Sequence, residues 1–152
     1  MSEAATANAP STDIVKDADA AVQLLAQVRA EIGKVVFGQE RVVELVLATI
    51  LAGGHALLIG APGLAKTKLV ETTARALGLD WGRVQFTPDL MPSDILGSEI
   101  LDESASGRAF RFVKGPIFTS LLMADEINRG SPRTQSALLQ AMQGRHVTVA
   151  GA

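Results

Sequence analysis

Apolar residues recur at helical spacing over several stretches of this chain, and most of these stretches stop at a glycine. The periodicity predicts amphipathic helices, because residues three and four apart share one helix face. Ser131 followed by Pro132 adds an N-cap and a first-turn proline to the last of them. The predicted helices span residues 13–32, 39–52, 66–77 and 132–143, with a shorter one that Ser93 caps near residue 94.

Short apolar runs lie between these helices and predict strands at residues 56–59, 84–87, 121–124 and 146–149. Strands that alternate with helices are typical of an α/β fold with a parallel sheet. Residues 98–115 differ, because Phe110 and Phe112 alternate with polar residues beside a Ser-Ala-Ser-Gly turn, which predicts a β-hairpin. Residues 1–12 are predicted to be a disordered tail, and residues 13–152 a single domain.

The loop between the strand at 56–59 and the helix at 66–77 has the spacing of a phosphate-binding P-loop. In such a loop, backbone N–H groups and the helix N-terminus converge on the anion. Lys66 is placed to reach the β- and γ-phosphates, and the Thr67 hydroxyl to bind Mg²⁺. Ala65 stands where the pattern has a glycine, so we expect the loop to form if the φ angle of Ala65 is negative. A Gly/Pro turn with a solvated Lys66 is the alternative.

Two carboxylates follow the apolar strand at residues 121–124, at the edge of the sheet where ligands bind in open α/β folds. Asp125 can hold Mg²⁺ through water, and Glu126 can polarise the attacking water. A strand that ends where charge begins would explain one acid, but not its combination with an upstream P-loop. The combination predicts a nucleotide-hydrolysing site in which Lys66 and Glu126 are catalytic.

Composition narrows the class of protein. The 152 residues are 47% hydrophobic and 20% charged, which is typical of one globular domain. Lys and Arg are dispersed and the net charge is −2, so no nucleic-acid surface is predicted. The absence of cysteine excludes disulfides and thiolate metal sites and agrees with a cytoplasmic location. Charge and glycines interrupt the longest apolar tract, residues 42–59, so no membrane span is predicted.

Together these motifs resemble the MoxR branch of the AAA+ ATPases. The resemblance covers residues 35–149 and rests on four segments, residues 60–67, 85–94, 114–118 and 124–129. Ala65 in place of glycine is usual in that branch. The resemblance implies a P-loop NTPase fold with three α-β-α layers and a parallel sheet. It also implies that the hairpin near 98–115 is an insert that faces the pore of a ring.

The same resemblance implies that ATP and Mg²⁺ are the cofactors. Phe37 and Gly38 would lie against the adenine, and the metal ligands would be Thr67 and Asp125. The residues implied to bind the nucleotide are Phe37, Gly38, Gly60, Ala61, Pro62, Gly63, Leu64, Ala65, Lys66, Thr67 and Lys68.

The resemblance further implies a chaperone-like ATPase that remodels or matures protein complexes as a hexameric ring, with a von Willebrand factor A domain protein as partner. The core of that family continues past residue 144 with a sensor strand, arginine fingers and a helical lid. We therefore expect a core that is incomplete at its C-terminus and slow to hydrolyse ATP. Two alternatives remain: a nucleotide-binding module without effective hydrolysis, and a McrB-like GTPase subunit. The sequence has no Asn-Lys-x-Asp-type signal for guanine.

Overall fold

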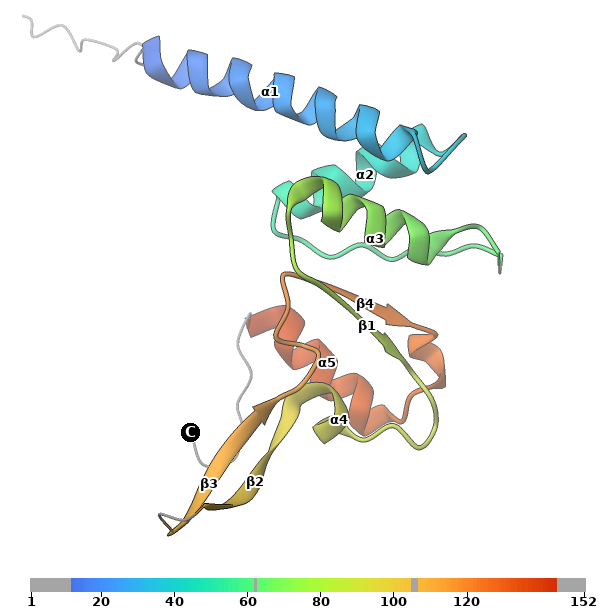
Figure 1. The fold of residues 1–152 in the computed structure, drawn as a ribbon. Coiled ribbons are helices and arrows are strands. Elements are labelled where there is room, and N and C mark those ends of the chain that lie inside the picture. Colours follow the sequence, from blue (N-terminus) through green and yellow to red (C-terminus); the bar gives the residue numbers. More distant parts are fainter. Residues whose placement is uncertain (1–11, 62, 105–106, 145–152) are drawn as a thin grey trace, which may run out of the picture.

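The computed structural model describes residues 12–61, 63–104 and 107–144. In chain order its elements are α1 (Thr12–Gly33), α2 (Glu40–Leu51), α3 (Lys66–Leu77), β1 (Trp81–Gln85), α4 (Pro92–Leu96), β2 (Gly97–Ser104), β3 (Gly107–Lys114), β4 (Leu121–Asp125), a 3₁₀ turn (Ile127–Arg129) and α5 (Pro132–Gly144), as Figure 1 shows. All four predicted long helices are confirmed. The predicted strand at 146–149 lies outside the described residues, as does the predicted tail up to residue 11.

Strands β1 and β4 form a parallel pair that runs in register from Trp81 opposite Leu121 to Gln85 opposite Asp125. The backbone N–H of Phe86 adds one more bond, to the Asp125 carbonyl at 2.9 Å. The strand predicted at 84–87 therefore begins earlier, at Trp81, and ends earlier, at Gln85. Helix α3 lies on one side of this pair and α4 and α5 lie on the other (Figure 1), which confirms the α/β fold with a parallel sheet.

The predicted strand at residues 56–59 is wrong for this structure, because the segment has no ladder partner. A strand needs a neighbour to satisfy its backbone N–H and C=O groups, and among the described strands β4 pairs only with β1. The side chains of Leu57 and Ile59 are accordingly 77% and 88% exposed. The His55 ring anchors the start of the segment, since its Nε2 donates to the Met142 carbonyl of α5 at 3.0 Å.

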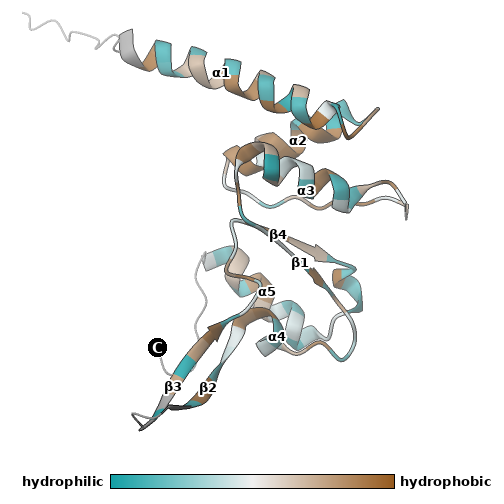
Figure 2. Ribbon diagram, in the orientation of Figure 1, coloured by the Kyte–Doolittle hydropathy of each residue, from teal (hydrophilic) through white to brown (hydrophobic). Residues whose placement is uncertain are grey.

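Two clusters of buried apolar side chains hold the described residues together. Ile32 and Leu69 belong to the first, which joins α1, α2 and α3. Phe86, Ile95 and Leu138 belong to the second, which joins the end of β1 to α4 and α5. Figure 2 shows hydrophobic residues concentrated on α2 and β4. The second cluster also includes Val84 of β1 and Leu122 and Ala124 of β4, whereas neither strand contributes to the first.

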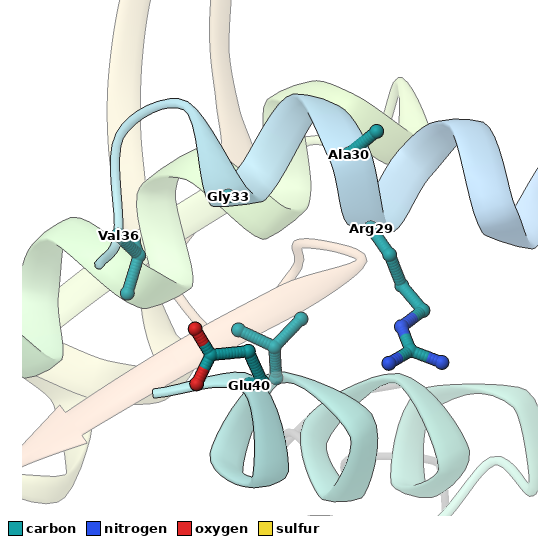
Figure 3. Close-up of a pocket in the computed structure, with 6 residues that line it drawn as sticks. Arg29, Ala30, Gly33, Val36 and Glu40 are labelled. Atoms are coloured by element: carbon teal, nitrogen blue, oxygen red, sulfur yellow. The ribbon is translucent and has the colours of Figure 1, made fainter. Parts of the chain in front are cut away.

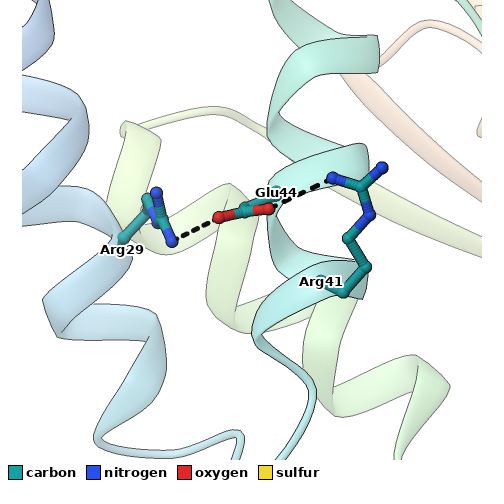
Figure 4. Close-up of polar contacts among 3 residues, drawn as sticks. All are labelled: Arg29, Arg41 and Glu44. Atoms are coloured by element: carbon teal, nitrogen blue, oxygen red, sulfur yellow. Dashed lines mark hydrogen bonds and ion pairs between the residues drawn. The ribbon is translucent and has the colours of Figure 1, made fainter.

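A cavity of about 210 Å³ lies between α1 and α2 in the first cluster (Figure 3). A polar contact also joins these two helices, because the Glu44 carboxylate of α2 accepts from Arg29 of α1 at 2.6 Å; within α2 it also accepts from Arg41 at 3.4 Å (Figure 4). The cavity contains no residue of the loop at 60–67 and neither residue of the acidic pair. Its lining residues are Arg29, Ala30, Gly33, Val36, Glu40 and Val43.

Strands β2 and β3 form the predicted antiparallel hairpin, with Gly97 opposite Lys114 at its base. Gly97 has a φ angle of +94°, and a Cβ there would lie 2.2 Å from the Val113 carbonyl oxygen, so the base requires glycine. Helix α4, which directly precedes the hairpin, has a different N-cap residue from the one predicted. Met91 rather than Ser93 is the N-cap, and its N–H donates to the Asp94 carboxylate at 2.8 Å.

The exposed segment at 56–59 yields a stability prediction. Replacing Ile59 with Ser should change the free energy of unfolding by no more than about 0.5 kcal/mol, because the side chain is already in water. Ile95→Ala should cost about 2–5 kcal/mol, because Ile95 is fully buried. Urea unfolding followed by Trp81 fluorescence measures both values. A loss above about 1 kcal/mol for Ile59→Ser would show that the segment packs as a strand.

Candidate functional site

The N-terminus of α3 and the carboxyl ends of β1 and β4 lie on the same side of the molecule (Figure 1). Helix α3 begins at Lys66, directly after the predicted phosphate loop, and α3 contacts β4. The loop and the acidic pair, which are far apart in the sequence, therefore flank one edge of the fold. This is the edge at which open α/β sheets bind ligands.

The Lys66 side chain folds back over the loop. Its ammonium donates to the Gly60 carbonyl at 2.7 Å and to the Ala61 carbonyl at 3.2 Å. A lysine held within the curve of its own loop differs from the solvated lysine expected of a plain turn. The positive charge is consequently fixed between the start of the loop and the N-terminus of α3, and both features attract an anion.

Ala65 has left-handed backbone angles, with φ +53° and ψ +26°, so the negative φ that was the condition for the loop to form is not met. The left-handed region costs a residue with a Cβ about 1–2 kcal/mol. These angles set up the first turn of α3, because the Leu69 N–H donates to the Ala65 carbonyl at 2.9 Å. Gly63 also has a positive φ, +83°, where glycine carries no such penalty.

The segment predicted to face the adenine lies beside the loop. The Gln39 side chain donates from Nε2 to the Leu64 carbonyl at 3.2 Å and so joins the start of α2 to the loop. Phe37, two residues earlier, is 77% exposed, and Gly38 has a φ angle of +69°. An exposed aromatic ring next to a phosphate loop is suited to stacking on a base. The sequence pattern does not predict this contact between Gln39 and Leu64.

Each residue of the acidic pair is bound by an arginine. Arg83 of β1 donates from Nη2 to the Asp125 carboxylate at 2.7 Å, and also to Gln85 Oε1 at 2.9 Å. The Glu126 carboxylate contacts Arg129 Nε at 3.1 Å. Both arginines are therefore paired within the chain, Arg83 with Asp125 and Arg129 with Glu126.

Glu126 is the second residue with left-handed angles, with φ +52° and ψ +42°. These angles turn the chain sharply out of β4 and into the 3₁₀ turn. Residues without glycine's freedom seldom take this conformation, and where they do they often belong to functional sites. The two described residues other than glycine with a positive φ are Ala65 and Glu126, one in the loop and one in the acidic pair.

Arg83 is the polar residue at this edge that the sequence analysis missed. Alternate residues of a strand share a face, so Arg83 and Gln85 could have been grouped from the sequence. Their approach to Asp125 could not, because it depends on the register between β1 and β4. That register sets residues 81 and 121 opposite each other across a long stretch of intervening chain.

The donors at this edge suit Mg²⁺ rather than a metal held by protein alone. The Thr67 hydroxyl and the Asp125 carboxylate are hard oxygen ligands, and Mg²⁺ is usually held by one or two such groups plus substrate phosphates. Among the described residues no group of three or more His, Cys, Asp and Glu side chains could hold a metal ion. Asp89 lies in the turn between β1 and α4, where hydrogen bonds from the Thr87 side chain and from its own backbone lower the pKa of its carboxyl group.

Known proteins similar to this chain include several of one family. The family model described as "ATPase family associated with various cellular activities (AAA)" matches residues 55–152. Chaperone MoxR1 of Mycobacterium tuberculosis is 45% identical over 132 residues, which are 87% of this chain and 34% of that protein. Protein MoxR of Methylorubrum extorquens is 38% identical over 128 residues, or 81% of this chain and 36% of that protein.

A solved structure agrees with these relatives. A crystal structure from Cytophaga hutchinsonii, described as that of a "putative ATPase", superposes with a TM-score of 0.79 at 41% identity. The superposition covers 93% of this chain and 43% of that one. The chain thus spans about a third of the length of the curated relatives it matches and under half of that solved structure.

The left-handed angles of Ala65 yield a second prediction. Ala65→Gly should leave the protein as stable or raise its free energy of unfolding by up to about 1 kcal/mol, because relief of strain outweighs the added chain entropy. Ala74→Gly within α3 is the helical control and should lose at least about 1 kcal/mol. Urea unfolding compares the two. A loss at Ala65 equal to the loss at Ala74 would mean that Ala65 is helical in solution.

Proposed function

The chain belongs to the MoxR branch of the AAA+ ATPases, and we propose that it binds ATP with Mg²⁺ at the edge formed by the loop and the acidic pair. The observation that supports this most strongly is the folding of Lys66 over its loop, beside the helix N-terminus that receives an anion. A phosphate would replace the Gly60 and Ala61 carbonyls as the partner of the ammonium. The loop N–H groups and Lys68, one residue beyond Thr67, would add to the positive field.

Thr67 and Asp125 are the residues that would hold Mg²⁺. The ion supplies charge neutralisation on the phosphates, which lowers the barrier to phosphoryl transfer. Asp125 stands at the end of β4, and Thr67 in the first turn of α3, an element that contacts β4. Phe37 and Gly38 would border the adenine, since Gln39 ties this segment to Leu64 of the loop.

Glu126 would act as the general base for the attacking water. Its left-handed backbone turns the residue away from the line of β4, and Arg129 holds its carboxylate at 3.1 Å. Arg129 contacts Oε2 and orients the carboxylate, which leaves Oε1 to accept the proton of the attacking water. Glu126 therefore serves the chemical step and Asp125 serves binding, whereas Lys66 serves both by neutralising charge on the β- and γ-phosphates.

We further propose for the whole protein a chaperone-like role in remodelling or maturing protein complexes. A relative named as a chaperone supports this proposal. A hexameric ring, a von Willebrand factor A domain partner and a cytoplasmic location are parts of the same proposal. In the described part of the chain, no helix combines the length and the apolar character that crossing a membrane requires. Competition between ATP and GTP for a fluorescent analogue tests the preference for adenine.

Lys66 should control affinity for ATP. Lys66→Ala should weaken binding about 10- to 100-fold, or about 1.4–2.8 kcal/mol, because it removes the cation that neutralises the β- and γ-phosphates. Calorimetry with ATP and Mg²⁺ measures the change. Lys16→Ala in exposed α1 is the control and should bind as the parent does. Equal affinity of the parent and the Lys66 variant would contradict the phosphate-loop role.

Glu126 should control turnover and spare affinity. In a counterpart that carries the complete ATPase core, Glu126→Gln should bind ATP normally and hydrolyse it at least about 100-fold more slowly, because a general base acts in the transition state. Phosphate release under single-turnover conditions, with calorimetry in parallel, separates the two effects. Hydrolysis at the parent rate would exclude Glu126 as the base.

A further inference from the structure

We propose that Arg83 is a positioning residue that competes with Mg²⁺ for the Asp125 carboxylate, and so sets how strongly nucleotide binding depends on Mg²⁺. This inference rests on the proposed function. It concerns a residue of β1 that lies outside both the phosphate loop and the acidic pair. The contact that carries it is the 2.7 Å bond from Arg83 Nη2 to Asp125 Oδ2.

The backbone register between β1 and β4 brings the charges of Arg83 and Asp125 together. Gln85 lies opposite Asp125 in the parallel pair, and Arg83 is two residues before Gln85 on the same strand face. The guanidinium reaches diagonally to Asp125 and is also held by Gln85 Oε1 at 2.9 Å. Two acceptors fix its direction, so the charge of Arg83 is directed at the carboxylate that would hold Mg²⁺.

Arg83 and Mg²⁺ make opposing demands on Asp125. A carboxylate already bonded to a guanidinium offers less negative charge and one fewer free oxygen to the hydrated ion. The fixed cation also repels a divalent ion placed nearby. The Arg83 side chain is 45% exposed and that of Asp125 is 22% exposed, so solvent screens the contact and permits exchange of one partner for the other.

A purely structural brace is the alternative for this ion pair, because the bond also joins β1 to β4. The hairpin contains a cross-strand ion pair that serves as a comparison for such a structural role. Arg111 of β3 contacts Asp102 of β2 at 3.2 Å, and both side chains are more than half exposed. Removal of a brace changes stability, whereas removal of a competitor changes the effect of Mg²⁺ on nucleotide affinity.

The test measures the Mg²⁺ enhancement, defined as the Kd of a fluorescent ATP analogue in EDTA divided by its Kd in saturating Mg²⁺. In Arg83→Met the enhancement should rise about two- to fivefold, the range set by a partly exposed charge pair. Arg83→Lys keeps the charge with fewer bonds and should give a smaller rise. Arg111→Met should leave the enhancement unchanged. Thermal melts in EDTA report any loss of stability separately.

Asp125→Asn supplies the internal check. It should reduce the enhancement, and adding Arg83→Met to it should produce no further change, because the shared partner is gone. An enhancement that falls or stays constant in both Arg83 variants overturns the inference, even if their melting temperatures drop. If Arg83→Met does not fold, a lack of any rise in Arg83→Lys overturns it as well.

The two levels of proposal fail in different ways. A parent chain that binds no ATP analogue, with or without Mg²⁺, overturns the proposed function and this inference together. A parent chain whose binding depends on Lys66, combined with an unchanged enhancement in the Arg83 variants, overturns the role of Arg83 alone.

Discussion

The parallel pairing of β1 with β4 is the constraint on which the rest of the structure depends. It brings Asp125, at the end of one strand, level with Gln85 at the end of the other. The second core cluster packs against this pair through Phe86, Ile95 and Leu138, so the register is held by side chains as well as by the backbone ladder. Because β4 also contacts α3, the position of the acids relative to the loop follows from the same pairing.

Strain is concentrated at two points of this arrangement. Ala65 and Glu126 both have left-handed angles that cost a residue with a Cβ about 1–2 kcal/mol. One turns the chain from the loop into α3, and the other turns it out of β4. Packing beyond each strained residue offsets this cost, since Leu69, which follows Ala65, and Leu138, which follows Glu126, are both buried. The strained residues are thereby fixed at the edge where the proposed chemistry takes place.

The sequence was sufficient for the features that depend on local pattern. Helical periodicity predicted α1, α2, α3 and α5, and alternation around a Ser-Gly turn predicted the hairpin. The motif spacing identified Lys66 and Asp125 as candidates, and the structure places their elements at one edge. Each of these signals lies within a short window of residues and does not depend on which distant segments pack together.

Features that depend on distant partners could not be predicted. The apolar run at 56–59 looks like a strand, but a strand also needs a neighbour, and none of the described strands lies beside it. The angles of Ala65 follow from how the loop joins α3, not from the preference of alanine. The ion pair of Arg83 with Asp125 could not be predicted either, because it depends on the register between β1 and β4.

The most direct test of the central claim is paramagnetic broadening by Mn²⁺ in place of Mg²⁺, with ATP present. The claim is that the loop at 60–67 and the acids at 125–126 form one nucleotide–metal site. It predicts loss of the backbone amide signals of both segments at substoichiometric Mn²⁺, while signals at the far end of the hairpin remain. Broadening of the loop without broadening at residues 125 and 126 would contradict it.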